Sequence, residues 1–351
     1  MNETNFIPRQ KFILNIISQS KGLWRGEIQK KIGTRYQISK PTIIRDLDNL
    51  IRKNLIRTEG KGKNTKYFPY SKNPLLKPFD IDLYFADEPD KRINAKKSFD
   101  FSVFNHLNEL FSSVEKEEIN EFRESFNKQV KKLSPDIFKK ELERFVIELS
   151  WKSTKIEGNT YTLLEAEELI KSNKRAEGKS REEAAMILNH KRAFEKILEN
   201  KARFKKLNLS DINQLHNTLI KDLNISAGIR KNPVGITGTV YRPFDNEFQI
   251  KQVMEKLVKA VNKNREPLEK ALIINSMISY IQPYSDGNKR TGRMLANAVL
   301  LAHDYYPLSY RSIDEKEFKK ALILFYEQNS IYHLKRLFIE QLIFAYNNYF
   351  K

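Results

Sequence analysis

A short polar loop interrupts two long apolar segments near the three-quarter point of the chain. Residues 281–293 have the sequence IQPYSDGNKRTGR, which holds one acid, an Asn and three cations. Gly287 permits a positive φ after Asp286, and a helix starting at Asn288 would point its free N–H groups into the loop. Because a helix N-terminus of this kind attracts anions, the loop predicts a phosphate site. The cations that add charge beside it are Lys289, Arg290 and Arg293.

Asp286 narrows the kind of phosphate compound that this loop could bind. A carboxylate would repel a bare phosphate, but it is well placed to hold a Mg²⁺ ion that bridges phosphate oxygens. The acid among the cations therefore indicates a complex of a metal with a nucleotide. An alternative stays open, in which Asp286 only caps the helix and the cations pair with neighbouring acids.

The composition limits the classes of protein and of site that the chain can form. A length of 351 residues exceeds one typical domain, so two or three domains are expected. The chain has no Cys, which excludes disulfides, thiol catalysis and Cys-ligated metal centres, and its five His are scattered. The first ten residues lack a signal-peptide layout, and the apolar runs are too short to span a bilayer. We therefore expect a cytoplasmic protein with no membrane partner and no structural metal.

The positive charge of the chain is concentrated at its N-terminus. The formal net charge is +19, and residues 1–80 hold 17 basic and 6 acidic side chains, or +11 of that total. An excess of this size suggests a polyanionic partner for this part of the chain.

The N-terminal region is expected to form three short helices followed by a hairpin. Apolar residues recur at helical spacing, Gly22 breaks the pattern, and Ser39 is a good helix cap before a further apolar stripe. Two β-prone stretches then flank the glycine-rich basic turn GKGKN. The helices are expected over residues 9–20, over 28–32 and after Ser39, and the two strands over 55–59 and 65–69.

This arrangement resembles the winged helix-turn-helix of bacterial regulators over roughly residues 9–70. In that family a helix enters the major groove of DNA while the wing contacts phosphates. The stretch ISKPTIIRDL, residues 38–47, resembles the recognition helix. Cations on its outward face and at the wing tip predict DNA binding, although a module for protein contacts stays an alternative. The expected DNA-binding residues are Lys40, Thr42, Arg45, Lys61 and Lys63.

The remainder of the chain predicts a mainly α fold. The segment after the hairpin is rich in Pro and acids and resembles a linker that packs on a neighbour. Residues 229–250 hold Gly, Val, Tyr and Pro and predict a short β-hairpin. The expected parts are a DNA-binding domain at residues 1–75, a linker at 76–100 and a helical domain at 101–351.

Apolar helices are expected on both sides of the polar loop and at the C-terminus. The helices at residues 271–281 and 294–301 are apolar on most sides and should lie at the centre of a bundle. The C-terminal helices carry Phe325, Leu337 and Phe338, which could belong to the core or to the face of a homodimer.

The loop and two further segments together resemble the Fic (Fido) family. Its signature is His-x-Phe-x-Asp/Glu-Gly-Asn-Gly-Arg-x-x-Arg, which residues 282–293 follow at most positions. The stretch STKIEGN, residues 153–159, resembles the family's inhibitory pattern Ser/Thr-x-x-x-Glu-Gly/Asn. Residues 228–238, GIRKNPVGITG, look like its substrate-binding flap hairpin. The resemblance spans about residues 101–351, and the three motifs occur in the family's order.

The resemblance implies that AMP is transferred from Mg-ATP to a Ser, Thr or Tyr hydroxyl of a target protein. The implied cofactors are thus ATP and Mg²⁺. Asp286 would hold the metal, Arg293 would meet the γ-phosphate, and Asn297 would lie near the adenine or ribose. The remaining residues implied to bind the nucleotide are Gly287, Asn288, Lys289 and Arg290, and the implied catalytic positions are Gln282, Asp286, Arg290 and Arg293.

The family also implies an inhibitory contact and a flap. Glu157 would form an ion pair with Arg293 and keep the γ-phosphate out of its productive position, with Ser153 and Gly158 completing the motif. A plain helix-terminal acid before a Gly cap is the alternative for Glu157. The flap would pair its main chain with a segment of the target. Its residues are Gly235, Ile236, Thr237, Gly238, Val240 and Tyr241.

Two positions depart from the family's signature. Gln282 replaces the His that takes the proton from the attacking hydroxyl, and an amide can orient a hydroxyl but cannot act as a general base. Lys289 stands where many members have Gly, and it either shifts which phosphate is attacked or points to solvent. Tyr284 replaces Phe and keeps an aromatic anchor.

Two hypotheses of different class follow from these observations. In the first, the protein is a slow or conditional adenylyltransferase that is inhibited by Glu157 and impaired at Gln282. In the second, it has lost transfer chemistry and acts as a nucleotide-responsive, DNA-binding transcriptional regulator.

Overall fold

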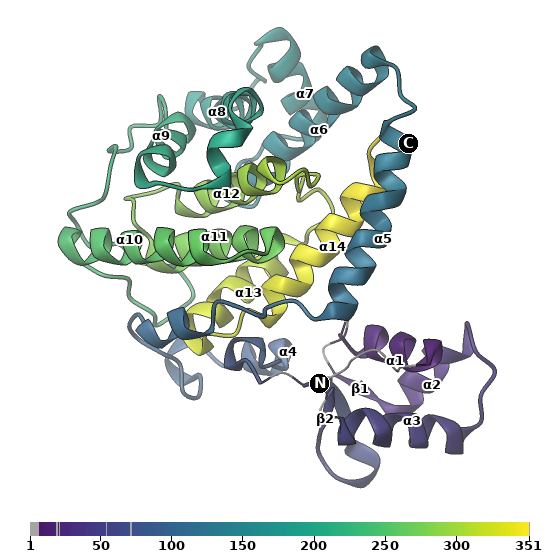
Figure 1. Ribbon diagram of the computed structural model, residues 1–351. Helices are drawn as coiled ribbons and strands as arrows, with labels where there is room; N and C mark the ends of the chain where they lie inside the picture. Colours follow the sequence, from purple (N-terminus) through teal and green to yellow (C-terminus); the bar gives the residue numbers. More distant parts are fainter. Residues whose placement is uncertain (1–6, 19, 21, 54, 71, 351) are drawn as a thin grey trace.

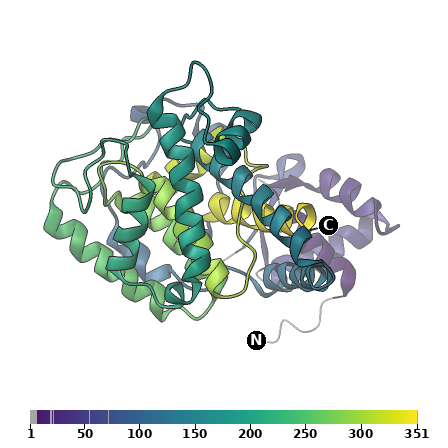
Figure 2. The same ribbon diagram turned by 90° about the horizontal axis from the view of Figure 1, so that it is seen from above.

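The computed structural model describes residues 7–350 except positions 19, 21, 54 and 71. Over these residues it contains fourteen α-helices and one small antiparallel sheet, so the fold is mainly helical. Figure 1 shows two parts, an N-terminal module (residues 7–70) and a larger helical body (residues 101–350). Seen from above, the module stands to one side of the body (Figure 2). The expectation about a signal sequence concerns residues that lie largely outside the described part.

The N-terminal module has three helices and three strands around its own apolar core. The expected hairpin is present, with Ile56 opposite Pro69 and Glu59 opposite Lys66. A two-residue strand before the second helix adds to this hairpin, so the strand order is β1-β3-β2. The elements are α1 (Pro8–Ser18), β1 (Leu23–Trp24), α2 (Arg25–Gly33), α3 (Lys40–Arg52), β2 (Ile56–Glu59), η1 (Gly62–Asn64) and β3 (Lys66–Pro69).

Helix α3 begins where its sequence predicts and packs on α1. The Ser39 side chain accepts a hydrogen bond from the Thr42 backbone N–H, as an N-cap residue does. Asp46 is buried on the inner side of α3, and its carboxylate lies 2.6 Å from Nε of Arg9 on α1. This ion pair fixes the inner face of α3, so the opposite face is presented to solvent.

The connecting segment (residues 72–100) is packed on the helical body rather than extended. Leu75 and Leu76 are buried in the main core, and the Leu75 carbonyl accepts a 2.7 Å hydrogen bond from the Ile331 N–H. The segment contains short helical turns at η2 (Pro74–Leu76), α4 (Ile81–Tyr84) and η3 (Pro89–Lys91).

The helical body contains ten α-helices among the described residues. Helix α6 starts after a Ser134 cap and α9 after an Asn208 cap. The bounds are η4 (Phe101–His106), α5 (Ser113–Val130), α6 (Pro135–Lys155), α7 (Leu163–Ser172), α8 (Arg181–Glu199), η5 (Lys201–Lys205), α9 (Leu209–Leu219), α10 (Glu247–Lys263), α11 (Pro267–Ile281), α12 (Asn288–Ala302), α13 (Glu315–Gln328) and α14 (Tyr332–Asn348).

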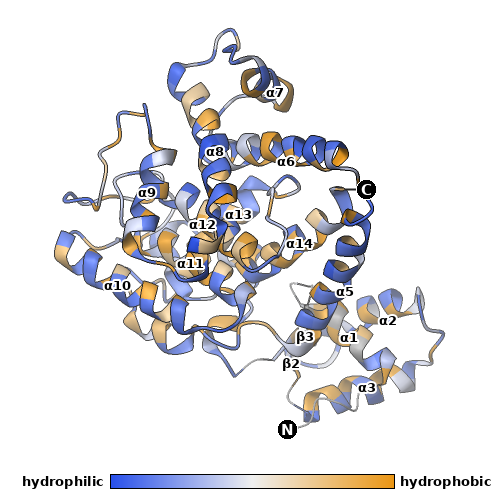
Figure 3. Ribbon diagram, turned by 45° about the horizontal axis from the view of Figure 1, so that its top comes forward, coloured by the Kyte–Doolittle hydropathy of each residue, from blue (hydrophilic) through white to orange (hydrophobic). Residues whose placement is uncertain are grey.

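Helices α11 and α12 form the centre of the body, as their apolar character predicts. Apolar residues gather around them, whereas the outer helix α5 is largely hydrophilic (Figure 3). The two helices approach closely at Gly292, where an added Cβ would lie only 2.8 Å from the backbone oxygen of Asn275. The polar loop therefore joins two tightly packed helices and has a rigid base.

The C-terminal helices belong to the core of the body. Phe325, Leu337 and Phe338 are all buried in the main apolar cluster, so they are core residues and not the exposed face that a homodimer would need. In the part of the chain that the structure describes, none of the helices combines the length and apolar character needed to cross a bilayer.

The β-hairpin predicted within residues 229–250 is absent. Residues 229–246, all described, form an irregular loop with no assigned strand, and α10 begins at Glu247. The reason is that backbone N–H groups of this segment donate to distant partners: Arg230 to the Pro283 oxygen and Arg242 to the Lys97 oxygen. We keep the name flap for residues 235–241.

Candidate active site

The polar loop is closed by a left-handed residue at each end. Gln282 ends α11 with φ 52°, and Gly287 precedes α12 with φ 78°. Inside the loop, the Asn288 side chain accepts a hydrogen bond from the Tyr284 N–H at 2.8 Å and donates one back to the Tyr284 oxygen at 2.8 Å. These bonds brace the loop from within.

The N-terminus of α12 opens into this loop as the sequence predicts. The Thr291 N–H is the first to bond within the helix, to the Gly287 oxygen, so the three preceding N–H groups lie ahead of the helical ladder. Asp286 lies beside them with 68% of its side chain exposed. Its carboxylate accepts from the Gly287 N–H at 2.5 Å and from Nη2 of Arg290 at 3.2 Å.

Arg290 is a buried cation with spare donor capacity. Its side chain is only 2% exposed, and among the described residues its Nη1 has no hydrogen-bond partner. Burial lowers the pKa of this guanidinium, although arginine stays charged. A buried, incompletely satisfied guanidinium next to a helix N-terminus favours an anionic ligand.

Glu157 reaches the site from the end of α6. Its carboxylate lies 2.8 Å from Nη1 of Arg293, so the predicted ion pair is present. Gly158 follows with φ +99° in the turn after α6, so Glu157 lies at the helix end as well as in the ion pair. The carboxylate also lies 2.6 Å from Nζ of Lys289. Burial opposes ionisation, but Arg293 and Lys289 outweigh it and lower the pKa of Glu157 to about 2.

Lys289 does not point freely to solvent, and its effect on which phosphate is attacked stays a prediction. Its ammonium neither points freely to solvent nor lies in the phosphate loop, because the Glu157 carboxylate attracts it. The sequence could not show this contact, since α6 and α12 are more than a hundred residues apart.

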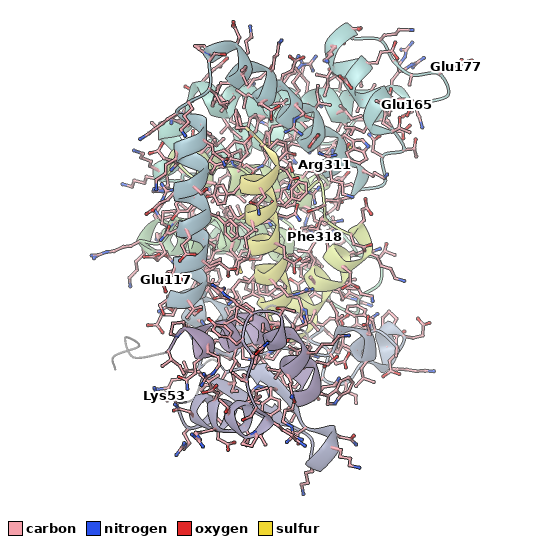
Figure 4. The ribbon with its side chains drawn as sticks, turned by 90° about the vertical axis from the view of Figure 1, so that its right-hand side faces the viewer. Lys53, Glu117, Glu165, Glu177, Arg311 and Phe318 are labelled. Atoms are coloured by element: carbon pink, nitrogen blue, oxygen red, sulfur yellow. The ribbon has the colours of Figure 1, made fainter. Side chains whose placement is uncertain are left out.

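Arg293 is held by more than its ion pair. Its Nε donates to Oγ of Ser153 at 3.0 Å, and its Nη2 donates to the Ser153 carbonyl at 2.7 Å. The guanidinium lies 5.8 Å from the ring of Phe318, which Figure 4 labels within the helical body, above Lys53 of the module. Every nitrogen of this buried side chain is thus engaged by the end of α6.

His190 on α8 completes this network. Its Nδ1 lies 2.9 Å from the Met186 carbonyl and must donate to it, so Nε2 accepts from the Ser153 hydroxyl at 3.0 Å. Burial, with Arg290 and Arg293 nearby, lowers the pKa of His190 to about 3. The ring is therefore a neutral acceptor that orients Ser153.

The amide of Gln282 is used within the fold. Its Oε1 accepts from Nδ2 of Asn288 at 2.9 Å, and its Nε2 donates to the Ser279 carbonyl at 2.7 Å. With both ends engaged and only 7% of the residue exposed, it has little capacity left to orient a substrate hydroxyl.

His216 lies under the loop but does not replace the missing base. Its ring stacks on Tyr284 at 3.6 Å between centroids, and its Nε2 donates to the Asp286 carbonyl at 3.0 Å. Burial lowers the pKa of His216 to about 4, and the residue is fully buried. It supports the backbone of the loop.

Asn297 does not fit the nucleotide contact that the resemblance implies. Its side chain is fully buried, donates to the Leu308 carbonyl at 2.9 Å and accepts from the Leu308 N–H at 2.8 Å. A contact with adenine or ribose would require these bonds to break. In this structure Asn297 instead fixes the backbone of Leu308, in the segment after α12.

The flap residues lie beside the loop, tied to it by Arg230. This side chain donates to the Gln282 carbonyl at 2.7 Å and to the Asn232 carbonyl at 2.8 Å, and it also contacts the Phe244 carbonyl. One guanidinium thus joins residues before and after the flap to the start of the loop. Exposure decreases along the flap, from exposed Gly235 and Thr237 through half-buried Ile236, Gly238 and Val240 to buried Tyr241.

The expected DNA-contacting residues lie in the N-terminal module, far from the loop in sequence. The four cations among them, Lys40, Arg45, Lys61 and Lys63, are exposed, whereas Thr42 is half-buried and its hydroxyl lies 2.9 Å from that of Ser39. They lie on the outward face of α3 and at the tip of the β2–β3 turn.

Among the described residues, no cluster of three or more His, Cys, Asp or Glu could hold a metal alone. A single exposed carboxylate fits a Mg²⁺ ion that keeps waters and takes its other ligands from phosphates. Asp286 satisfies that requirement.

Comparison with known proteins agrees with this geometry. Residues 206–300 match the model of the Fic/DOC family. The chain contains a Fic/DOC domain. Protein adenylyltransferase Fic from Drosophila willistoni is 28% identical over 159 residues, which are 44% of this chain and 32% of that protein. The enzyme of the same name from Drosophila ananassae is 28% identical over 156 residues, 44% of this chain and 31% of that protein. The chain thus spans about a third of the curated relatives it matches.

Solved Fic structures share the fold of the body. A Fic domain containing signaling protein from Bacteroides thetaiotaomicron has a TM-score of 0.57 at 22% identity, covering 66% of this chain and 94% of its own. Fic-1 (residues 134–508) from C. elegans has a TM-score of 0.56 at 17% identity, covering 66% and 69%. The matched segment includes the polar loop and the flap, whereas the end of α6 precedes it in the chain.

Proposed function

We propose that the Fic/DOC domain is a protein adenylyltransferase that transfers AMP from Mg-ATP to a protein hydroxyl and is autoinhibited by Glu157. The observation that carries this proposal is the ion pair of Glu157 with Arg293, 2.8 Å long, beside the open N-terminus of α12. The curated relatives bear the name protein adenylyltransferase. A carboxylate that occupies a cation of a phosphate site competes with a phosphate group for it.

In this proposal, different residues of the site bind different parts of the Mg-nucleotide complex. The backbone N–H groups of residues 288–290 and the free Nη1 of Arg290 would bind phosphate oxygens. Asp286 would hold the Mg²⁺, which neutralises charge on those oxygens. Arg293 would meet the γ-phosphate only after it leaves Glu157. The exposed start of the flap would align the target segment.

Gln282 makes the proposed reaction slow. Without a general base the attacking hydroxyl must lose its proton to solvent, and such a loss usually lowers rates by about 10² to 10⁴. Positioning and charge stabilisation by the loop would persist.

The test is incubation of four purified full-length proteins with Mg-ATP labelled at the α-phosphate: wild type, Glu157→Gly, Gln282→His and the double variant. We expect the most label in the double variant, about 10² to 10⁴ times less in Glu157→Gly, and none in wild type. Mass analysis would identify the added AMP. If calorimetry found no ATP or ADP affinity at millimolar levels in Glu157→Gly, the nucleotide site itself would be refuted.

A second candidate is a nucleotide-responsive transcriptional regulator without transfer activity. The specific observation in its favour is the Gln282 amide, whose two ends are engaged by Asn288 and Ser279. In this proposal the N-terminal module is a winged helix that binds DNA. Its element order and the exposed cations of α3 and of the β2–β3 turn support DNA binding. Label that appears only after Gln282→His would favour this candidate.

The DNA proposal is tested by gel shift with the DNA upstream of the protein's own gene. Arg45→Ala and Lys61→Ala should each weaken binding and reduce its salt dependence, because each removes a phosphate contact. Lys171→Ala, an exposed lysine on α7, is the matched control and should have no effect. Equal binding by all three variants would count against a DNA-contacting winged helix.

A further inference from the structure

A buried carboxylate at the end of α13 fastens the flap. Glu327 has no exposed side-chain surface, yet the site described above does not use it. Its Oε1 accepts from Oγ1 of Thr239 at 2.6 Å and from the Val240 N–H at 3.2 Å, both in the flap. The flap thus lacks strand pairing but has a charged anchor.

The other donors to Glu327 come from the connecting segment. Arg92 places Nη1 3.2 Å from both carboxylate oxygens, and the Tyr84 hydroxyl donates to Oε2 at 2.8 Å. The Glu327 backbone carbonyl also accepts from the Lys96 N–H at 2.9 Å. A carboxylate has about four acceptor positions, and here four donor groups use them.

Arg92 contacts the flap directly as well. Its Nη1 donates to the Gly238 carbonyl at 2.9 Å, and its guanidinium packs 4.5 Å from the ring of Phe85. Only 7% of its side chain is exposed. Because a buried charge without its partner is strongly unfavourable, Arg92 and Glu327 must stay together, and they hold residues 238–240 with them.

We propose that Glu327 is a positioning residue that fixes residues 238–240 of the flap, with Arg92 as its counter-charge. Residues 235–237 are left to pair with an incoming target segment. The Thr239 hydroxyl is the side-chain group of the flap that Glu327 binds. The role of the flap in target binding rests on the proposed function, whereas the anchoring itself does not.

Hydrogen exchange measured by mass spectrometry on the full-length protein tests the anchor. Thr239→Val removes the hydroxyl, which donates to Glu327 and accepts from the Tyr241 N–H at 3.1 Å, and keeps the side-chain shape, whereas Glu327→Gln removes the charge and leaves the Tyr241 bond in place. We expect each to raise the exchange rate of the peptide covering residues 238–242 at least tenfold, with the peptides of α11 and α12 unchanged.

Two matched variants separate anchoring from general damage. Thr239→Ser keeps the hydroxyl and should exchange like wild type. Glu115→Gln removes another buried carboxylate, which lies in the first turn of α5 and pairs with Lys335 at 2.7 Å, and should leave the flap peptide unchanged. Wild-type exchange of the flap in both Thr239→Val and Glu327→Gln would overturn the proposal.

Nucleotide binding distinguishes this proposal from the proposed function. In the Glu157→Gly background, Thr239→Val should leave the ATP dissociation constant unchanged within about twofold by calorimetry, because Glu327 acts on the target side. Absence of ATP binding in both proteins would refute the proposed function but not the exchange result, which needs neither nucleotide nor target. A loss of ATP affinity confined to Thr239→Val would contradict an anchor that acts on the flap alone.

Discussion

At the scale of single residues, Lys289 bears on the proposed inhibition by Glu157. Glu157 holds Arg293 and Lys289 at 2.8 and 2.6 Å, so one carboxylate withdraws two cations from the phosphate loop. When Glu157 is removed, both cations become available to phosphate oxygens. Under the proposed function, we expect the same lysine to have opposite effects on nucleotide binding with and without Glu157.

The effect of Lys289→Ala on ATP affinity should therefore have opposite signs in wild type and in Glu157→Gly. In wild type we expect it to strengthen ATP binding by several-fold, because Glu157 loses one of its two partners. In Glu157→Gly we expect it to weaken ATP binding by a similar factor, because a phosphate contact is lost. Calorimetry of the four proteins gives the coupling.

Lys174→Ala is the control for this cycle, since Lys174 pairs with Glu168 at the surface of α7. It should not change ATP affinity in either background. An effect of Lys289→Ala on ATP affinity with the same sign in both backgrounds would contradict the idea that Lys289 and Arg293 together hold Glu157 in place.

The depressed pKa of Glu157 also predicts a pH dependence of stability. The folded value is about 2, against an ordinary value of 4.5, so its contribution is fully present above about pH 4.5 and lost as the pH falls towards 2. The 14% exposed side chain is mostly shielded from solvent, and the shift corresponds to about 3 kcal/mol.

Urea unfolding of wild type and Glu157→Gln between pH 2 and 7 measures this contribution. The difference in free energy of unfolding should be largest above pH 4.5 and shrink by about 3 kcal/mol towards pH 2. A difference that is independent of pH would show that the ion pairs contribute no net stability. Inhibition should accordingly persist at every physiological pH.

The sequence predicts the residues of the site better than their partners. Asp286, Arg290 and Arg293 follow from a spacing within one loop, and Glu157 follows from a second short motif. His190, Arg230 and Glu327 could not be predicted, because each acts on a segment far away in the chain. The sequence around a buried His, Arg or Glu does not indicate which distant residue it will contact.

At the scale of elements, the close contact of α11 with α12 supports the loop. Gly292 is the point where α12 meets the backbone of Asn275, with 2.8 Å available for a Cβ. The backbone cannot yield as a flexible side chain would. Any larger residue must push the two helices apart below the polar loop.

Gly292→Ala should lower the free energy of unfolding by about 1–3 kcal/mol, as overpacking does. Gly26→Ala, in α2 with nothing within 4 Å of the added Cβ, is the control and should raise stability by up to about 1 kcal/mol. Denaturant unfolding measures both. A stable Gly292→Ala protein would mean that the helices separate at little cost.

Helices were predicted more reliably than the flap for a physical reason. A cap such as Ser39 acts within three residues, so a helix start can be predicted locally. The hairpin at residues 229–250 was predicted from Gly, Val and Tyr, but its backbone partners are Pro283, Lys97 and the Glu327 carboxylate. Competition from distant acceptors cannot be predicted from local composition.

At the scale of the whole molecule, the module and the body touch away from the loop. The Tyr332 hydroxyl on α14 donates to the Ser20 carbonyl at 2.8 Å, and α1 packs beside α5. Neither contact includes residues 281–293. The exposed cations of α3 and of the β2–β3 turn thus lie in a module that contacts the body away from the loop proposed to bind the nucleotide.

We therefore expect little linkage between nucleotide and DNA. In Glu157→Gly, saturating Mg-ATP should change the affinity for the upstream DNA by less than about twofold, measured by fluorescence anisotropy at fixed salt. A change of fivefold or more would instead support the nucleotide-responsive regulator, and ATP affinity should then change by the same factor when DNA is added.

The network around Arg293 has a consequence for how activation would proceed in time. To turn towards a nucleotide, this side chain must leave Glu157, the Ser153 hydroxyl and the Ser153 carbonyl together, because these partners lie within five residues, in the last turn of α6 and the turn that follows it. Intermediate positions would keep the cost of the broken bonds without the gain of new ones. Release of Arg293 should accordingly be an all-or-none event. Each molecule would then be either inactive or able to bind the nucleotide with Arg293, without intermediate states.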